Sequence, residues 1–188
     1  ISQGRKLPKN WSLQDAIDDI IAGGTIERVQ YRPFDSKYTV YTGKSCGWLW
    51  RPRTETMNLL CNGTDNIALN VTRIVQKGSE YHHVFISDCI TDKGLLSSKD
   101  NAFVFPLYRY DIESGKAKKH SNFSSEFLGK FERVISLPIN ENKEVSDRSC
   151  ISSKDILAYI YAMLHSQKYC NYYRESLITE FPKVAYPQ

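Results

Sequence analysis

The sequence lacks the features of several common protein classes. No apolar run approaches the roughly 20 residues that a bilayer span requires, and no leader of the secretory type is recognisable. There is no internal repeat and no low-complexity tract. Of the 188 residues, 41% are hydrophobic and 12% aromatic, which excludes disordered chains, collagens and coiled coils. The sequence therefore predicts a soluble, globular, single-domain protein without a membrane partner.

Cysteines are present, but their spacing shows no pairing pattern. The odd, scattered set contains no Cys-x-x-Cys motif, which argues against a disulfide framework and against a zinc ribbon. Free cysteines favour a reducing compartment, so we expect a cytoplasmic protein. The five positions are Cys46, Cys61, Cys89, Cys150 and Cys170.

Catalytic motifs are also missing. Residues 43–45, Gly-Lys-Ser, resemble the end of a phosphate-binding loop, but Tyr38 stands where that loop needs its first glycine. Cys46 lacks the neighbours of a papain-type nucleophile. On a strand, His82 and His83 would point to opposite faces rather than to one metal. No nucleophile elbow and no dinucleotide fingerprint occur. We therefore expect no catalytic residue, no metal and no cofactor in this chain, which by itself would not be an enzyme.

One enzymatic alternative stays open. Asp35 and Lys37 match half of a metal-dependent nuclease site, and Asp15, Asp18 or Asp19 could supply its second carboxylate. Such a site needs two carboxylates that converge on one cation, with the lysine assisting the attacking water. The pattern is short and common, so a nuclease is the alternative rather than the leading interpretation.

The chain begins with helical periodicity. Ser12 can cap a helix, and the glycine pair at 23–24 can end it. We expect its apolar stripe to pack on the core while aspartates face solvent. The stripe consists of Leu13, Ala16, Ile17, Ile20 and Ile21.

The middle of the chain is rich in short β-like runs that turn residues separate. Residues 54–61 predict a short helix capped by Thr54, and residues 116–120 a small basic loop. The predicted strands are 26–31, 38–41, 47–50, 66–71, 83–86 and 102–107.

The last third is helical again. Aromatic and aliphatic residues at helical spacing predict a helix over 123–135, and residues 138–149 predict an exposed loop. Ser152 or Ser153 caps a helix with an apolar stripe over 156–164, and further helical turns follow near 169–173. An N-terminal helix, a mixed or antiparallel β middle and C-terminal helices predict an α+β fold.

Positive charge is concentrated in one segment. The whole chain carries +4, whereas residues 28–53 carry six cations and one anion. Six aromatic residues are interleaved with these cations, so on short strands the aromatics would form an inner face and the cations an outer one. Such an outer face suits phosphates and guanine edges. The alternative is an ordinary aromatic core beneath a solvated charged face.

Several short motifs resemble one protein family and occur in the family's order between residues 28 and 187. Together they resemble the C-terminal specificity region of type ISP and related helicase-fused restriction–modification adenine methyltransferases. Residues 183–185 depart from the family's Arg-Ile-Pro-like run but keep its charge and bulk. The motifs are Tyr31-Arg32-Pro33-Phe34-Asp35, Tyr41-Thr42, Arg51-Pro52-Arg53, Phe105-Pro106-Leu107-Tyr108, Glu180-Phe181-Pro182-Lys183 and residues 85–90, 158–166 and 169–177.

The resemblance implies that residues 1–188 are one target-recognition domain of a larger bacterial, cytoplasmic restriction–modification enzyme. Its partners would be double-stranded DNA and an upstream adenine-N6 methyltransferase domain that flips the adenine out of the duplex. S-adenosylmethionine would belong to that domain, with ATP and magnesium as further candidate cofactors of the parent. A third interpretation is a module that docks another domain of the parent through its aromatic face.

The basic segment and the resemblance together give a set of expected DNA contacts. We expect most of these contacts to go to phosphates and a few to base edges. The stronger candidates are Arg32, Lys37, Lys44, Arg51 and Arg53, and the weaker ones are Arg73, Lys93 and Lys99.

Overall fold

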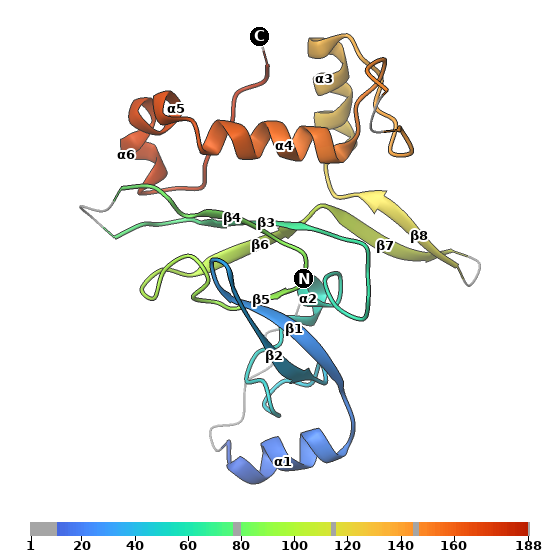
Figure 1. Ribbon diagram of the computed structural model, residues 1–188, viewed down its shortest axis with the longest axis vertical. Coiled ribbons are helices and arrows are strands. Elements are labelled where there is room, and N and C mark those ends of the chain that lie inside the picture. The colour runs from blue at the N-terminus through green and yellow to red at the C-terminus, as the bar shows by residue number, and fades with distance from the viewer. Residues whose placement is uncertain (1–10, 77–79, 114–115, 145–146, 188) are drawn as a thin grey trace.

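The computed structural model describes residues 11–76, 80–113, 116–144 and 147–187 (Figure 1). A helix comes first, strands with one short helix follow, and the chain ends in helices, which confirms the α+β class. The elements are α1 (Leu13–Ile21), β1 (Thr25–Arg32), β2 (Asp35–Tyr41), α2 (Thr54–Met57), β3 (Ala68–Thr72), β4 (Val84–Ser87), β5 (Ile90–Thr91), β6 (Ala102–Pro106), β7 (Tyr108–Glu113), β8 (Lys116–Ser121), α3 (Ser125–Ile135), α4 (Ser153–Leu164), α5 (Gln167–Tyr172) and α6 (Arg174–Leu177).

The strands form three small sheets. In the first, β1 lies between β2 and β5, antiparallel to β2 and parallel to β5. In the second, β3 lies between β4 and β6 and is antiparallel to both. Strands β7 and β8 pair as a separate antiparallel hairpin. The predicted mixed or antiparallel middle region is therefore confirmed.

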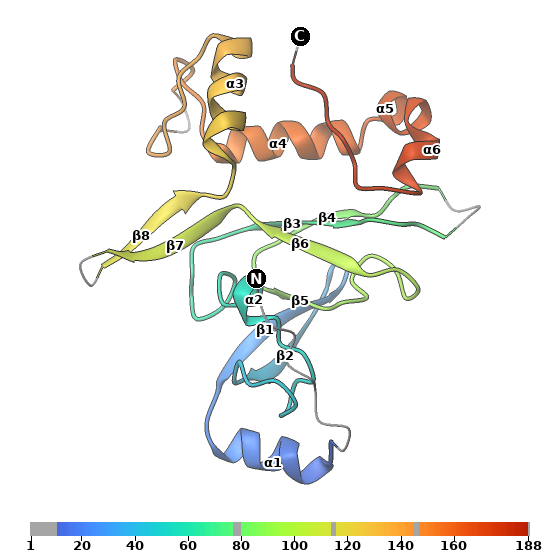
Figure 2. The ribbon, with the colours of Figure 1, turned by 180° about the vertical axis from the view of Figure 1, so that it is seen from behind.

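The C-terminal helices pack on one face of the sheet β4-β3-β6. Leu164 of α4 and Leu177 of α6 join Val71 and Val84 of this sheet in one buried cluster. Ile156 of α4 is fully buried, and a buried aliphatic side chain contributes about 1.5–3 kcal/mol relative to an exposed one. Both views place the helices α3 to α6 on the same side, with α1 at the opposite end of the molecule (Figures 1 and 2).

The other face of this sheet meets the sheet β2-β1-β5. Tyr41 of β2 and Ile90 of β5 pack with Ala68 of β3 and with residues of and after α2. Beside this apolar cluster, the fully buried Asn70 donates from Nδ2 to the Ser87 hydroxyl at 2.8 Å. Buried polar groups need such partners. The Ser87 hydroxyl in turn lies 3.0 Å from the Thr91 hydroxyl of β5, so the contact between the two sheets is partly polar.

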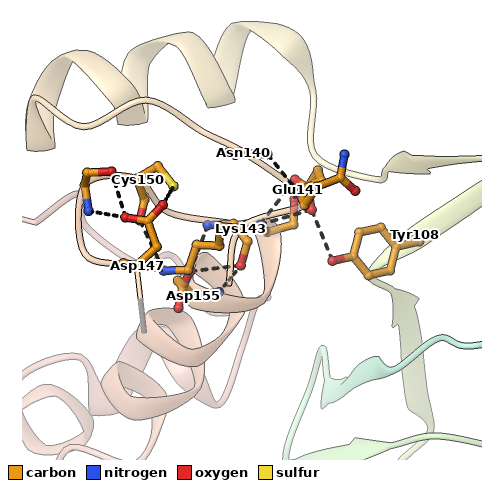
Figure 3. Close-up of polar contacts among 11 residues, drawn as sticks. Tyr108, Asn140, Glu141, Lys143, Asp147, Cys150 and Asp155 are labelled. Carbon is orange, nitrogen blue, oxygen red and sulfur yellow. Dashed lines mark hydrogen bonds and ion pairs between the residues drawn. The ribbon is translucent and has the colours of Figure 1, made fainter. Parts of the chain in front are cut away.

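The loop at 138–149 is fastened to the start of α4 (Figure 3). Glu141 accepts hydrogen bonds from the Ser153 hydroxyl and N–H. Lys143 Nζ lies 2.9 Å from a carboxylate oxygen of Asp155, which also completes the cap of α4. The described residues of the segment form a mostly exposed loop, as expected, and these two charged side chains hold it against the helix.

Several sequence-based boundaries need correction. Residues 47–50, predicted as a strand, form an irregular turn, and residues 116–120, predicted as a loop, belong to strand β8. Helix α2 ends at Met57 and is preceded by Arg53 without a side-chain cap, so the predicted Thr54 cap and the extension to residue 61 are wrong. The helix predicted from 123 begins at 125, with Ser124 as its cap.

Two further expectations, one about disulfides and one about membrane-spanning helices, can be compared with the structure. All five cysteines are free. Burial raises the pKa of Cys61 to about 11, so this side chain stays a thiol near neutral pH and serves the core. No helix in the described part of the chain is long and apolar enough to span a bilayer.

Candidate nucleic-acid interface

The β1–β2 hairpin carries the centre of the basic segment. Pro33 and Phe34 form its two-residue turn, closed by the pair Arg32 and Asp35. Proline suits the second position of a tight turn because its ring fixes φ at about −65°. The buried side chain of Gln30 donates from Nε2 to the carbonyls of Arg32 at 2.8 Å and Asp35 at 3.4 Å. The turn is therefore held from within by hydrogen bonds.

Two predicted DNA contacts, Arg32 and Lys37, lie at this end, which we call the hairpin tip (residues 31–37). Arg32 forms an ion pair with Asp92 at 2.9 Å, and its guanidinium carbon lies 4.0 Å from the centre of the Tyr31 ring. Lys37 Nζ is 3.6 Å from an oxygen of Asp35 and is exposed. Because exposed ion pairs are weak, the Lys37 ammonium is available to a phosphate. Arg32 is half-buried, and its ion pair with Asp92 joins the tip to the chain after β5.

The loop of residues 92–101 lies beside the hairpin tip. The Asp92 carboxylate accepts hydrogen bonds from Arg32 and from the N–H of Gly94, and so joins this loop to β1. Lys93 and Lys99 are both exposed in the loop. The structure therefore brings these two weaker candidates into a loop attached to the hairpin that carries Arg32 and Lys37.

The far end of β2 leads into a segment organised by Asp19 of α1, which is only 1% exposed. Its carboxylate accepts hydrogen bonds from the Thr42 hydroxyl and the Trp48 N–H, both at 2.8 Å. Lys44 Nζ lies 4.0 Å from the same carboxylate and stays largely exposed. A Cβ at Gly47 would overlap this carboxylate, so only glycine allows the segment to pass so close to α1.

Arg51 and Arg53 follow in the same segment, and both are exposed. With Lys44 they form a second basic group, at the opposite end of β2 from the hairpin tip. Seven extended residues separate the two ends by about 20 Å. Arg73 belongs to neither group, because its guanidinium carbon lies 6.0 Å from the ring of Phe181 on the helical side of the sheet β4-β3-β6.

Arg28, another cation of the basic segment, has a fixed partner. It pairs with Asp88, which lies between β4 and β5, and this hydrogen bond raises the pKa of Arg28. This ion pair therefore connects the sheet β2-β1-β5 to the residue that follows β4.

The expectation that the aromatic residues of this segment form an inner face is wrong. Of the six, only Tyr41 is buried. The hairpin extends away from the helical layer, and its buried contacts come mainly from the Tyr41 end and from β5. Exposed rings beside exposed cations are what nucleic-acid surfaces use, because rings stack on bases and cations meet phosphates. The exposed rings are Tyr31, Phe34, Tyr38, Trp48 and Trp50.

The carboxylates of the nuclease alternative do not converge. Asp35 lies at the hairpin tip, whereas Asp19 contacts the segment beyond the other end of β2. Asp15 caps α1, and Asp18 accepts a hydrogen bond from Gln14 on the same helix. Within the described residues, no three His, Cys, Asp or Glu side chains are placed to hold a metal ion. The proposed pair therefore cannot share one cation in this arrangement.

Sequence reasoning missed Gln30 and Asp92, which shape the tip, and it placed the Phe34 ring on an inner face although the ring is exposed. The Pro-Phe pair between two β-like runs indicates a turn, but the local sequence does not predict that the Phe34 ring faces solvent. Nothing local in the sequence marks Asp92, because it meets Arg32 across sixty positions of chain.

Comparison with protein families matches residues 2–188 to the type ISP C-terminal specificity domain. The chain belongs to this family. The match covers the whole described structure and agrees with the ordered motifs in the sequence. Comparison with curated proteins and with solved structures found no match. A type ISP specificity domain is the target-recognition part of a larger restriction enzyme, so the basic and aromatic surface is to be interpreted as part of such a polypeptide.

Proposed function

We propose that this type ISP specificity domain binds double-stranded DNA directly and reads a short target sequence. The observation that carries the proposal is the hairpin, which presents exposed aromatic rings and exposed cations on one hydrogen-bonded support. Family membership supports the same function, because specificity in a restriction enzyme means choice of a DNA site.

The cations divide into two roles under this proposal. Lys37, Lys44, Arg51 and Arg53 are exposed and suit phosphate contacts, which fix register and supply most of the affinity. Arg32 is held by Asp92 and acts as a positioning residue for the tip. Base edges would then be read by side chains that these phosphate contacts bring into a groove.

We further propose that the rest of the polypeptide carries an adenine-N6 methyltransferase and restriction activity. The methyltransferase would flip the target adenine while this domain holds the flanking duplex. S-adenosylmethionine, and ATP and magnesium where restriction needs them, would bind outside these 188 residues. This chain would supply no catalytic side chain.

A second candidate function is docking to that methyltransferase domain through α1. The aliphatic stripe of α1 (Leu13, Ile17, Ile20 and Ile21) is exposed, although it was expected to pack on the core, because the helix instead turns Ala16 and Asp19 inward. Leu13 is 67% exposed and Ile21 78%. Contiguous exposed apolar surface marks protein contacts, and α1 is the first described element of a domain whose family occupies the C-terminal part of a larger protein.

Selection of duplexes from a random-sequence pool tests the first proposal. The purified chain should retain duplexes that share a short motif, and exchange of this domain between two relatives should move the methylated sequence with it. Retention of duplexes without any shared motif, or unchanged methylation after the exchange, would contradict target reading by this domain.

A metal-supplemented plasmid assay separates this proposal from the nuclease alternative. We expect the chain with magnesium or manganese to leave plasmid DNA intact. Cleavage that Asp35→Ala abolishes would support the nuclease instead.

A further inference from the structure

We propose that Phe34 is a wedge that enters the base stack and kinks the duplex when the domain binds. The inference rests on the proposed DNA-binding function and adds a deformation step to it. Apolar wedges between base steps commonly produce kinks of about 20–90°, and phenylalanine and proline are among the side chains that act in this way.

Exposure is the first observation. Phe34 is 94% exposed, more than any other large hydrophobic side chain in the described part of the chain. It stands at the apex of the β1–β2 hairpin, whereas Tyr41 on the same hairpin is buried. A ring with this exposure is accessible to a base step.

The backbone at Phe34 is the second observation. Its φ is 63°, in the left-handed region where glycine is favoured and a bulky side chain is an outlier. This conformation costs free energy, and the almost fully exposed ring recovers little of it through burial. Local folding therefore favours glycine at this position, and the presence of phenylalanine there points to a use outside the folded chain.

Support of the ring is the third observation. Phe34 and Phe85 of β4 meet edge to face, with ring centres 5.4 Å apart and planes at 81°. Gln30 holds the turn from below, and the Arg32–Asp92 ion pair holds its flank. Because the turn beneath the ring is held in this way, its backbone loses little conformational entropy when the ring binds, which favours insertion.

The charges around the tip favour nucleic acid over protein as the partner. Lys37 is exposed three residues after Phe34, and Lys93 is exposed in the loop that Asp92 joins to Arg32. The aliphatic stripe of α1, by contrast, has aspartates beside it and no basic residue in its last turn. An aromatic apex flanked by cations suits stacked bases between phosphates.

The experiment measures duplex bending by energy transfer between dyes at the two ends of short duplexes recovered in the selection above. Wild-type protein should shorten the end-to-end distance, and Phe34→Gly, which keeps the turn conformation, should remove the bend. Because stacking contributes strongly to such contacts, we expect about tenfold or greater loss of affinity with an unchanged salt slope. Phe34→Leu should keep most of the bend, because leucine is also a known wedge.

Ile26→Ala is the matched control, because Ile26 is also exposed but lies at the other end of the same hairpin. It should leave the bend and the affinity unchanged. If Phe34→Gly bends the duplex as wild type does, the wedge is wrong while the proposed function stands. If wild-type protein does not bind duplexes, the proposed function itself fails. If Phe34→Gly leaves DNA binding intact but loses contact with the rest of the polypeptide, Phe34 serves a protein interface and the wedge is again wrong.

Discussion

The aliphatic stripe of α1 and the tip of the β1–β2 hairpin are both exposed apolar surfaces, yet their chemistry differs. The stripe consists of leucine and isoleucine with aspartates beside it, and the tip consists of Tyr31 and Phe34 with Arg32 and Lys37. Aliphatic surface gains most from burial against another apolar surface, whereas rings and cations together suit bases and phosphates. Under the proposed function, this difference would give one small region two partners, a protein at α1 and DNA at the tip.

The same region differs from the helical side of the molecule. Of the seventeen exposed large hydrophobic side chains in the described residues, eleven lie between Trp11 and Trp50. The helices α4 to α6 instead bury their apolar residues against the sheet β4-β3-β6. The helical side therefore buries much of the core, and most of the exposed apolar surface that the proposed function uses lies in residues 11–50.

The largest expected effect is a loss of stability, and it compares a buried residue of the helical side with an exposed residue of α1. Ile156→Ala removes a fully buried side chain and should lower the free energy of unfolding by about 2–5 kcal/mol. Ile21→Ala, in the stripe, should change it by less than about 0.5 kcal/mol. Urea denaturation of both variants measures this. A comparable loss for Ile21→Ala would mean that the stripe is part of the folding core.

The next effect concerns the joint between α1 and the segment after β2. Asp19→Ala leaves the Trp48 N–H and the Thr42 hydroxyl without their acceptor, which should cost about 1–3 kcal/mol. Asp18→Ala is the control, because Asp18 is exposed on the same helix. Equal stability of the two variants, measured by the same denaturation, would show that Asp19 does not hold this joint.

A smaller effect compares the two surfaces in DNA binding. Lys37→Ala should reduce affinity for all duplexes alike and reduce the salt slope by about 1. Leu13→Gln with Ile21→Gln should leave the affinity of this chain unchanged but lower methylation by the intact polypeptide. Anisotropy titrations and a methylation assay measure these outcomes. If the double variant Leu13→Gln with Ile21→Gln loses duplex affinity, DNA contacts α1, and the two surfaces do not have different partners.

The smallest effect is acid destabilisation of the loop that packs on α4. Burial alone would raise the pKa of Asp155, but hydrogen bonds from Ser152 and Lys143 outweigh it, so the pKa is lowered. Hydrogen bonds from Ser149 and Cys150 hold the pKa of Asp147 at about 2. Both carboxylates therefore stabilise the fold above the ordinary pKa of 3.8. The contribution of Asp147 is lost as the pH falls toward about 2, and that of Asp155 is lost as the pH falls below 3.8.

Denaturation between neutral pH and about pH 2 checks this pH dependence. Asp155→Asn should flatten the acid limb of the stability profile, whereas Asp111→Asn, an exposed control on β7, should not. An unchanged acid limb in Asp155→Asn would contradict the role given to this carboxylate.

The hydrophobic periodicity of the sequence predicted where helices and strands lie better than it predicted what they pack against. Helix α1 has the predicted bounds and cap, yet its apolar face is exposed, because a helical pattern shows which face is apolar and not what covers it. Strand β8 was missed because a separate two-stranded hairpin rich in lysine lacks the apolar alternation of a covered strand. The aromatic run at 47–50 looked like a strand, but Asp19, far away in sequence, holds it as a turn.

The residue types of the candidate site could be predicted from the sequence, but their arrangement in space could not. The concentration of cations in residues 28–53 can be counted in the sequence, and their exposure follows from the cost of burying charge. Their division into two groups depends on the length and direction of β2. The fixed position of Arg32 depends on Asp92, a contact that only the folded chain creates.

The dependence of duplex affinity on salt concentration tests the central claim most directly. Four phosphate contacts, from the exposed cations Lys37, Lys44, Arg51 and Arg53, predict that the logarithm of affinity falls against the logarithm of salt with a slope of about −4. A slope near zero would show that these cations do not meet phosphates, and would contradict DNA binding by this surface.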